Sequence, residues 1–161
     1  ILVLEKSYRQ DSAGAGCQRG GLGQIVRARK LYDDDKTSQV GLYPIGVGVS
    51  TDGLFGGEAG HGANAKVTNT STGDITEIGT GALVTLTSDQ EIVELRLPGG
   101  SGYGDPTERN FESISLDLRD EYVSAEEAIN RYCCEIDDSG TVNVGKSTAL
   151  RQRKRNRKEV A

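Results

Sequence analysis

The sequence predicts a mainly β protein: a sheet or sandwich-like body with a small helical appendage at the C-terminal end, forming part of a larger α+β protein. Two observations support this class. Up to Pro106, apolar and polar side chains alternate with period two, and the connections are rich in glycine. After Pro106 the period changes to about 3.6, which is typical of amphipathic helices. We therefore divide the chain into a glycine-rich β body, residues 1–106, and a helical C-terminal segment with a basic tail, residues 107–161.

Apolar stretches with alternating polarity predict the strands of the body. They cover residues 1–9, 25–32, 39–50, 64–70, 83–87 and 91–97. Glycines at positions 41, 46 and 48 predict bulges or close packing in the third stretch. In the last stretch, Glu94 and Arg96 are expected to point away from a buried face. That face is formed by Ile92, Val93, Leu95 and Leu97.

Three helices are expected after the β body. One face of a first short helix, which starts near Thr107, carries Phe111, Ile114 and Leu118. A second helix begins at residues 124–127, where Ser-Ala-Glu-Glu forms a capping box. Ser147 or Thr148 is expected to cap a third helix that continues into the basic tail.

Length and composition indicate one folded domain that is part of a longer protein. The 161 residues are enough to bury a core, and 22 glycines against 3 prolines describe a loop-rich β chain. The sequence contains no Met and begins with a strand-like run, so we expect its own chain to extend further. No apolar stretch is long enough to span a membrane, and we expect no membrane partner. Cys17, Cys133 and Cys134 form no pairing pattern, which favours reduced thiols and a cytoplasmic location.

Charge is distributed unevenly along the chain. Residues 151–161 contain six Lys or Arg and one Glu, a net charge of +5; since the total is −5, residues 1–150 carry −10. Cations are favourable at a helix C-terminus, and no aromatic residues are interleaved with those of the tail. We therefore interpret the tail as a solvated helix end rather than a nucleic-acid-binding patch.

Three glycine-rich blocks are the most informative feature of the sequence. They cover residues 11–23, 53–60 and 99–104. The third block, followed by Asp105-Pro106, connects a strand to a helix and leaves backbone N–H groups unshielded, so it is a candidate cradle for an anion or a developing oxyanion. Its candidate ligand-binding residues are Gly99, Gly100, Ser101, Gly102, Gly104 and Asp105. A tight connection without a ligand, with Asp105 as a helix cap, is the alternative.

Two arginines flank the first block and are candidates for an anion clamp. Arg9 and Arg19 carry guanidinium forks that suit a carboxylate or phosphate. The alternative is a structural role, with each arginine bound to Asp11 or to a loop carbonyl. His61 is the one histidine of the chain, and we interpret it as a surface-loop residue rather than a general base or metal ligand. One His without a Cys/His set predicts no metal site here.

The ordered motifs resemble a known family. Residues 9–23, 53–57, 99–106 and 122–128 read Arg-x-Asp-Ser-x-Gly-Ala-Gly-x-x-Arg-Gly-Gly-Leu-Gly, Gly-Leu-Phe-Gly-Gly, Gly-Gly-x-Gly-Tyr-Gly-Asp-Pro and Tyr-Val-Ser-x-Glu-x-Ala. In this order they resemble the C-terminal portion of the hydantoinase B/oxoprolinase family, as in an N-methylhydantoinase B-like subunit. Ser101 departs from the pattern, because it interrupts the glycine run of the third block.

The resemblance implies part of an ATP-dependent enzyme that opens cyclic amides or imides such as hydantoins and 5-oxoproline. It also implies a cytoplasmic hetero-oligomer with an actin-like ATPase subunit or domain of the hydantoinase A type, where ATP and a divalent metal would bind. This segment itself is expected to bind no cofactor and, alone, to be inactive; its catalytic residues are unknown. The alternatives are a related ATP-dependent ketone carboxylase, and a non-catalytic docking domain of such a complex.

Overall fold

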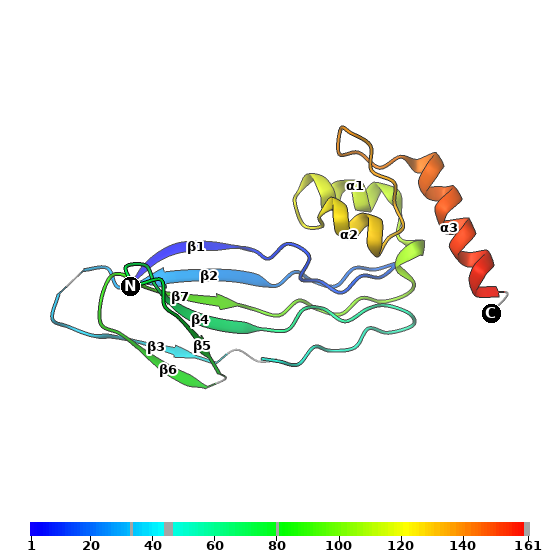
Figure 1. Ribbon diagram of the computed structural model, residues 1–161. Helices are drawn as coiled ribbons and strands as arrows, with labels where there is room; N and C mark the ends of the chain where they lie inside the picture. Colours follow the sequence, from blue (N-terminus) through cyan, green and yellow to red (C-terminus); the bar gives the residue numbers. More distant parts are fainter. Residues whose placement is uncertain (33, 44–46, 80, 160–161) are drawn as a thin grey trace.

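The computed structural model describes residues 1–32, 34–43, 47–79 and 81–159, and it confirms the mainly β class. Seven strands form two sheets, and the helices follow at the C-terminal end (Figure 1). The strands are β1 Leu2–Tyr8, β2 Gln24–Arg29, β3 Ser38–Leu42, β4 Asn64–Asn69, β5 Ile75–Ile78, β6 Ala82–Leu86 and β7 Glu91–Arg96. The helical elements are η1 Pro106–Glu108, α1 Phe111–Arg119, α2 Ala125–Asn130 and α3 Val144–Glu159. Within these described ranges, no helix is both apolar and long enough to cross a bilayer.

The two sheets share one apolar core. The larger sheet has the order β1-β2-β7-β4-β5 with antiparallel neighbours throughout, and β3 pairs with β6 in the smaller one. The buried residues of this core come from both sheets: Ala28, Leu42, Ala65, Val84, Leu86 and Val93. Because successive strand residues point to opposite faces, these side chains fill the space between the sheets and fix their packing.

The opposite face of the larger sheet carries a row of alternating charge. The strand register places Glu5, Arg27, Glu94, Lys66 and Glu77 opposite one another across five strands. Glu94 and Arg96 lie on this outer face as predicted, yet Glu94 is only 6% exposed. Its carboxylate lies 2.8 Å from Arg96 Nε, 3.2 Å from Arg27 Nε and 3.7 Å from Lys66 Nζ. These long cationic side chains cover Glu94 and compensate its charge.

Three local predictions were wrong. The strand expected over residues 39–50 ends at Leu42, although residues 44–46 lie outside the described part of the chain. The short strand β5 was not predicted, because its four residues are mostly exposed and give no buried alternation. The third helix begins at Val144: Asn143 Oδ1 accepts from the backbone N–H of Lys146, whereas the buried Ser147 hydroxyl accepts from the N–H of Glu135.

The second helix starts where its sequence signal places it, whereas near Thr107 the chain forms only a 3₁₀ turn and α1 begins at Phe111. Ser124 caps α2 by accepting from the backbone N–H of Glu127 at 3.1 Å. Asp105 Oδ1 accepts from Thr107 N at 2.8 Å and opens the 3₁₀ turn η1, after which Asn110 caps α1. The helices enclose a second core of Ile114, Val123, Ala128, Tyr132, Cys134 and Val142, which Ala15 of the first glycine block joins. The boundary at residue 106 between a β body and a helical segment stays a prediction. The second core contains residues from both sides of that boundary.

The three glycine-rich blocks lie side by side and hydrogen-bond to one another through their backbones. The third block lies between the other two: Gly100 N donates to Gly21 O at 2.8 Å, and Gly102 N donates to Glu58 O at 2.8 Å. Gly14 N donates to Gly100 O at 2.8 Å in return. The blocks approach so closely that side chains are excluded, since a Cβ on Gly99 would lie 1.8 Å from Ser12 O. We call this assembly of residues 11–23, 53–60 and 99–104 the glycine layer.

Neighbouring glycines in the first block give a direct test of this packing. A Cβ on Gly20 would lie 2.0 Å from Gly100 O, a backbone atom that cannot move alone, whereas a Cβ on Gly21 meets no atom within 4 Å. We expect Gly20→Ala to lower the free energy of unfolding by about 2–3 kcal/mol, as overpacking does. Gly21→Ala should change it by less than about 0.5 kcal/mol. Urea unfolding of the two variants measures the difference, and equal stabilities would contradict the close packing.

Candidate functional site

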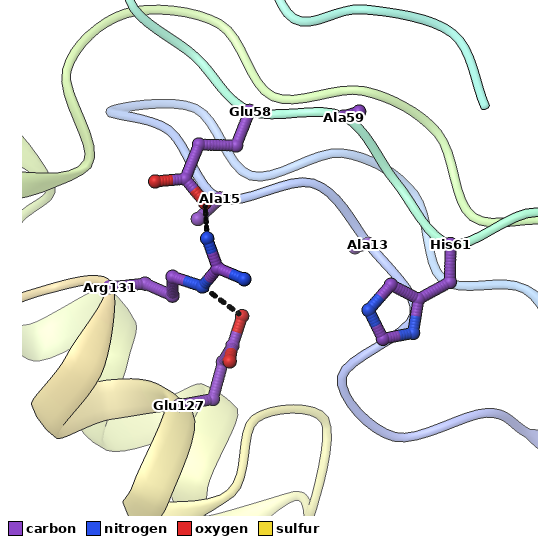
Figure 2. A pocket seen from close by; sticks show the side chains of 7 residues that line it. All are labelled: Ala13, Ala15, Glu58, Ala59, His61, Glu127 and Arg131. Carbon is purple, nitrogen blue, oxygen red and sulfur yellow. Dashed lines mark hydrogen bonds and ion pairs between the residues drawn. The ribbon is translucent and has the colours of Figure 1, made fainter.

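An open cleft lies where the glycine layer meets α2. Its volume is about 380 Å³, which is within the range of about 300–1,000 Å³ common for small-molecule sites. Its lining residues are Ala13, Ala15, Glu58, Ala59, His61, Glu127 and Arg131. Figure 2 shows Glu127 and Arg131 on one side of the cleft and the His61 imidazole on the other, with the small alanine side chains between them.

The backbone of the glycine layer holds one side of the cleft. Glu58 N donates to Ala15 O at 2.8 Å, and Glu58 O accepts from Gly102 N at 2.8 Å. His61 is held in the same way, because its N–H donates to Ser12 O at 2.8 Å and its carbonyl accepts from Gly99 N at 2.9 Å. The side chains of Glu58 and His61 therefore project from a fixed backbone, although each belongs to a connection rather than to a strand.

Helix α2 supplies the other side, and the first block fixes its position. Asp11 Oδ1 accepts from the backbone N–H of Ser124, the cap of α2, at 2.7 Å. Glu127 and Arg131 follow one helical turn apart, so both face the cleft. Arg131 then spans the cleft: Nη1 lies 2.7 Å from Glu58 Oε2, and Nε lies 3.6 Å from Glu127 Oε1.

Electrostatics distinguish Glu127 from an ordinary surface carboxylate. Burial raises the pKa of Glu127, and the nearby carboxylates of Asp11 and Glu58 raise it further, against the opposing effect of Arg131. A raised pKa favours the protonated form of the carboxyl group, and in that form the group can donate as well as accept a hydrogen bond. The exposed imidazole of His61 lies on the opposite side of the cleft from this carboxyl group.

Arg9 lies beside the cleft and has a backbone partner. Its Nη1 donates to Gly62 O at 2.9 Å, next to His61 in the chain. Partial burial and the charge of Arg96 lower the pKa of Arg9. The observed contact is the loop-carbonyl contact of the structural alternative, and the anion-clamp role of Arg9 stays a prediction.

Arg19 lies away from the cleft and binds a buried carboxylate. Its Nε and Nη2 donate to the two oxygens of Asp117 at 3.1 and 3.0 Å, and Arg109 Nη2 donates to Asp117 Oδ2 at 2.8 Å. Asp117 lies on α1, so this contact ties the first glycine block to the helices. Close to these three charged side chains, burial raises the pKa of Tyr132 to about 12. Arg19 Nη1 also donates to Gly20 O at 2.7 Å, which is the loop-carbonyl contact of the structural alternative. Its carboxylate partner Asp117 is a residue that sequence reasoning did not consider, and the anion-clamp role of Arg19 stays a prediction.

The N–H groups of the glycines in the third block already have partners. Gly99, Gly100, Gly102 and Gly104 each donate to a backbone carbonyl of another block or its flanking residues, at 2.8–2.9 Å. The Ser101 hydroxyl donates to Thr51 O at 2.9 Å. Asp105 caps η1, as its alternative interpretation predicted. These contacts give the block a structural role; an anion cradle in it stays a prediction, and an anion would have to replace hydrogen bonds that hold the fold.

Sequence reasoning missed Glu58, Glu127 and Arg131. The available signal was the i, i+4 Glu/Arg pair on the capped second helix, but nothing in the sequence indicated that this pair faces residues 58–61. Among the residues that the structure describes, no three His, Cys, Asp or Glu side chains come together as ligands of one metal ion.

Comparison with known proteins identifies the family of this chain. The Hydantoinase B/oxoprolinase model matches residues 1–106. The chain belongs to this family. The matched residues contain all three blocks of the glycine layer together with the cleft residues Glu58 and His61, whereas Glu127 and Arg131 lie beyond them.

Two curated relatives align with the helical segment as well. An uncharacterized protein of Methanocaldococcus jannaschii is 35% identical over 158 residues, which cover 94% of this chain and 26% of that protein. A putative B-type subunit of a D-/L-hydantoinase from Pseudomonas sp. strain NS671 is 24% identical over 152 residues, 94% of this chain and 25% of that protein. The chain thus spans about a quarter of the length of the curated relatives it matches.

Two solved structures share the fold. The nucleotide-free structure of acetone carboxylase superposes with a TM-score of 0.77 at 19% identity, over 99% of this chain and 25% of that one. The ATP-dependent caprolactamase from Pseudomonas jessenii superposes with a TM-score of 0.73 at 22% identity, over 94% of this chain and 26% of that one. At these identities the likeness establishes the fold.

The buried carboxylate of Asp117 yields a stability test. Asp117→Asn removes the charge that compensates Arg19 and Arg109, and breaking such a buried pair costs about 3–5 kcal/mol of unfolding free energy. Asp120→Asn is the matched control on the same helix end, because its pair with Arg119 is solvent-exposed and its loss should leave the unfolding midpoint nearly unchanged. Thermal unfolding of both variants measures the contrast, and a stable Asp117→Asn variant would show that the two arginines are held by other contacts.

Proposed function

We propose that this chain contributes to an ATP-dependent enzyme of the hydantoinase/5-oxoprolinase type, which opens cyclic amide or imide bonds. The observation that carries the proposal is the family match over residues 1–106. Two relatives support the reaction class: one is named as a putative hydantoinase component of the B type, and another is an ATP-dependent caprolactamase, an enzyme named for a cyclic amide. The residues of the cleft fit a role in binding such a ring.

The proposed assembly contains more than this chain. Its partners would be the rest of a longer hydantoinase B-type subunit and an actin-like ATPase subunit or domain of the hydantoinase A type. ATP and a divalent metal would bind to that partner, and phosphorylation of the poorly electrophilic amide oxygen would create a leaving group for attack by water. Here the glycine layer would position one side of the cleft and α2 the other. A cytoplasmic location agrees with the free thiols of Cys17, Cys133 and Cys134.

Two alternative functions remain within the proposal. A ketone carboxylase is the alternative reaction, in line with the fold shared with acetone carboxylase. A docking domain is in line with α3, whose residues 152–156 are exposed and which carries the basic tail. Nucleic acid is not among the proposed partners.

An assay of the assembled enzyme separates these functions. The full-length subunit, combined with its ATPase partner, should open hydantoin or 5-oxoproline only when ATP is present, whereas the purified 161-residue chain should open neither. The same complex, given acetone and bicarbonate with ATP, should form no carboxylated product. Ring opening by the isolated chain would contradict the proposal that activity requires the assembled enzyme. Carboxylation of acetone without ring opening would favour the ketone carboxylase.

A further inference from the structure

Arg9 carries a charge that is not compensated by a carboxylate in the part of the chain that the structure describes. Its Nη1 donates to the carbonyl oxygen of Gly62 at 2.9 Å, and no ion pair joins it to an Asp or Glu of those residues. Asp11, the nearest carboxylate in the sequence, accepts instead from the backbone N–H of Ser124 at 2.7 Å. Arg9 is half-buried, and a half-buried cation is stabilised by an anion beside it.

The strand register places Arg9 and Arg96 on the same face of the larger sheet. Ser7 lies opposite Ile25, and Ile25 lies opposite Arg96. Arg9 follows Ser7 by two residues and continues its strand, because the N–H of Arg9 donates to Gly23 O at 2.9 Å. Alternate residues of a strand point to one face, so both side chains lie on the outer face with the row of alternating charge. Partial burial lowers the pKa of Arg9, and the positive charge of the neighbouring Arg96 lowers it further.

The carboxylates of this part of the face are already shared among other cations. Glu94 lies 2.8–3.7 Å from three cationic groups, and Glu5 lies 3.6 Å from one of the same three. These three residues are Arg27, Lys66 and Arg96. With Arg9, four cations therefore stand against two carboxylates. The excess of positive charge lies at Arg9 and Arg96, because Arg9 has no share in either carboxylate.

Both guanidinium groups keep hydrogen-bond donors for a ligand. Of its five N–H donors, Arg96 directs Nε to Glu94 at 2.8 Å, and Arg9 directs Nη1 to Gly62. Within the described ranges, the Nη atoms of Arg96 and the Nε and Nη2 atoms of Arg9 make no hydrogen bond to protein. The side chain of Arg96 is 39% exposed, so an ion can reach it from solvent. The planar fork of a guanidinium matches two oxygen atoms of a carboxylate or a phosphate.

We propose that Arg9 and Arg96 form a binding site for an oxyanion, a carboxylate or a phosphate, on the outer face of the larger sheet. The anion lies between the two guanidinium groups, accepts hydrogen bonds from both and removes their mutual repulsion. The site is separate from the cleft, whose lining does not include either arginine. It gives Arg9 a different partner in an anion clamp, since Arg19 is bound to Asp117. The inference goes beyond the proposed function and does not depend on the reaction proposed above.

Anion titrations of the 161-residue chain, followed by NMR, test the site. Sodium phosphate and sodium acetate are added separately at constant pH and ionic strength, and sodium chloride is the reference salt. We expect the backbone amide signals of Gly62 and Arg96 to shift saturably with phosphate or acetate and not with chloride. The more tightly bound oxyanion then identifies the ligand group as phosphate or carboxylate. Shifts that are the same in all three salts, or that do not saturate, would overturn the proposal.

Variants of the sheet face test the assigned contacts. Arg9→Gln and Arg96→Gln should each weaken binding of the preferred oxyanion about tenfold, the loss expected for hydrogen bonds to a charged group. Arg29→Gln is the matched control: it removes the same charge from the same face, but Arg29 is already paired with Asp89 at 2.9 Å. Its affinity should stay within about twofold of the unchanged chain.

The dispersion of the amide spectrum shows whether each variant is folded. If either Gln variant does not fold, the corresponding Lys variant, Arg9→Lys or Arg96→Lys, replaces it. Lys keeps the charge but lacks the planar fork, so it should also bind the oxyanion more weakly than Arg does. Unchanged affinity in a folded variant of Arg9 or Arg96 would overturn the proposal. An equal loss in Arg29→Gln would also overturn it, because binding would then follow the overall charge of the face.

Discussion

Hydrogen bonds between the backbones of three glycine-rich segments hold this fold together. Residues 11–23, 53–60 and 99–104 are far apart in the sequence, yet their amides and carbonyls pair at 2.8–3.1 Å as strands in a sheet do. Glycine is required at several of these contacts because a Cβ would overlap the neighbouring backbone. Each N–H used in this way satisfies a buried polar group, so the layer is stabilised as a unit and cannot lose one segment without unpairing the others.

The position of the candidate site follows from this layer. Glu58 and His61 project from its second segment and the residue just after it, and Asp11 of its first segment fixes the start of α2 through Ser124. Arg131 closes the arrangement with an ion pair to Glu58. The layer provides rigidity, and the polar side chains at its edge line the cleft.

Features encoded locally could be predicted from the sequence, and features encoded by distant contacts could not. The capping box at Ser124 and the strand over residues 91–97 depend on neighbouring residues, and both were located correctly. The three glycine blocks were visible as well, and the N–H groups of the third block were a candidate anion cradle, with a tight connection without a ligand as the alternative. Their actual partners are carbonyls that only the folded chain brings near. For the same reason the contact of Arg19 with Asp117, and the pairing of Glu58 with Arg131, had no sequence signal.

Amide hydrogen exchange of the 161-residue chain tests the central role of the glycine layer most directly. If the blocks hold the fold through mutual hydrogen bonds, the amides of Gly14, Gly100, Gly102 and Tyr103 will exchange as slowly as those of β7, and all will become exposed together on global unfolding. Exchange of these four amides at the rate of open loops, while β7 stays protected, would contradict the account. It would show that the blocks are free connections whose N–H groups are available to a ligand.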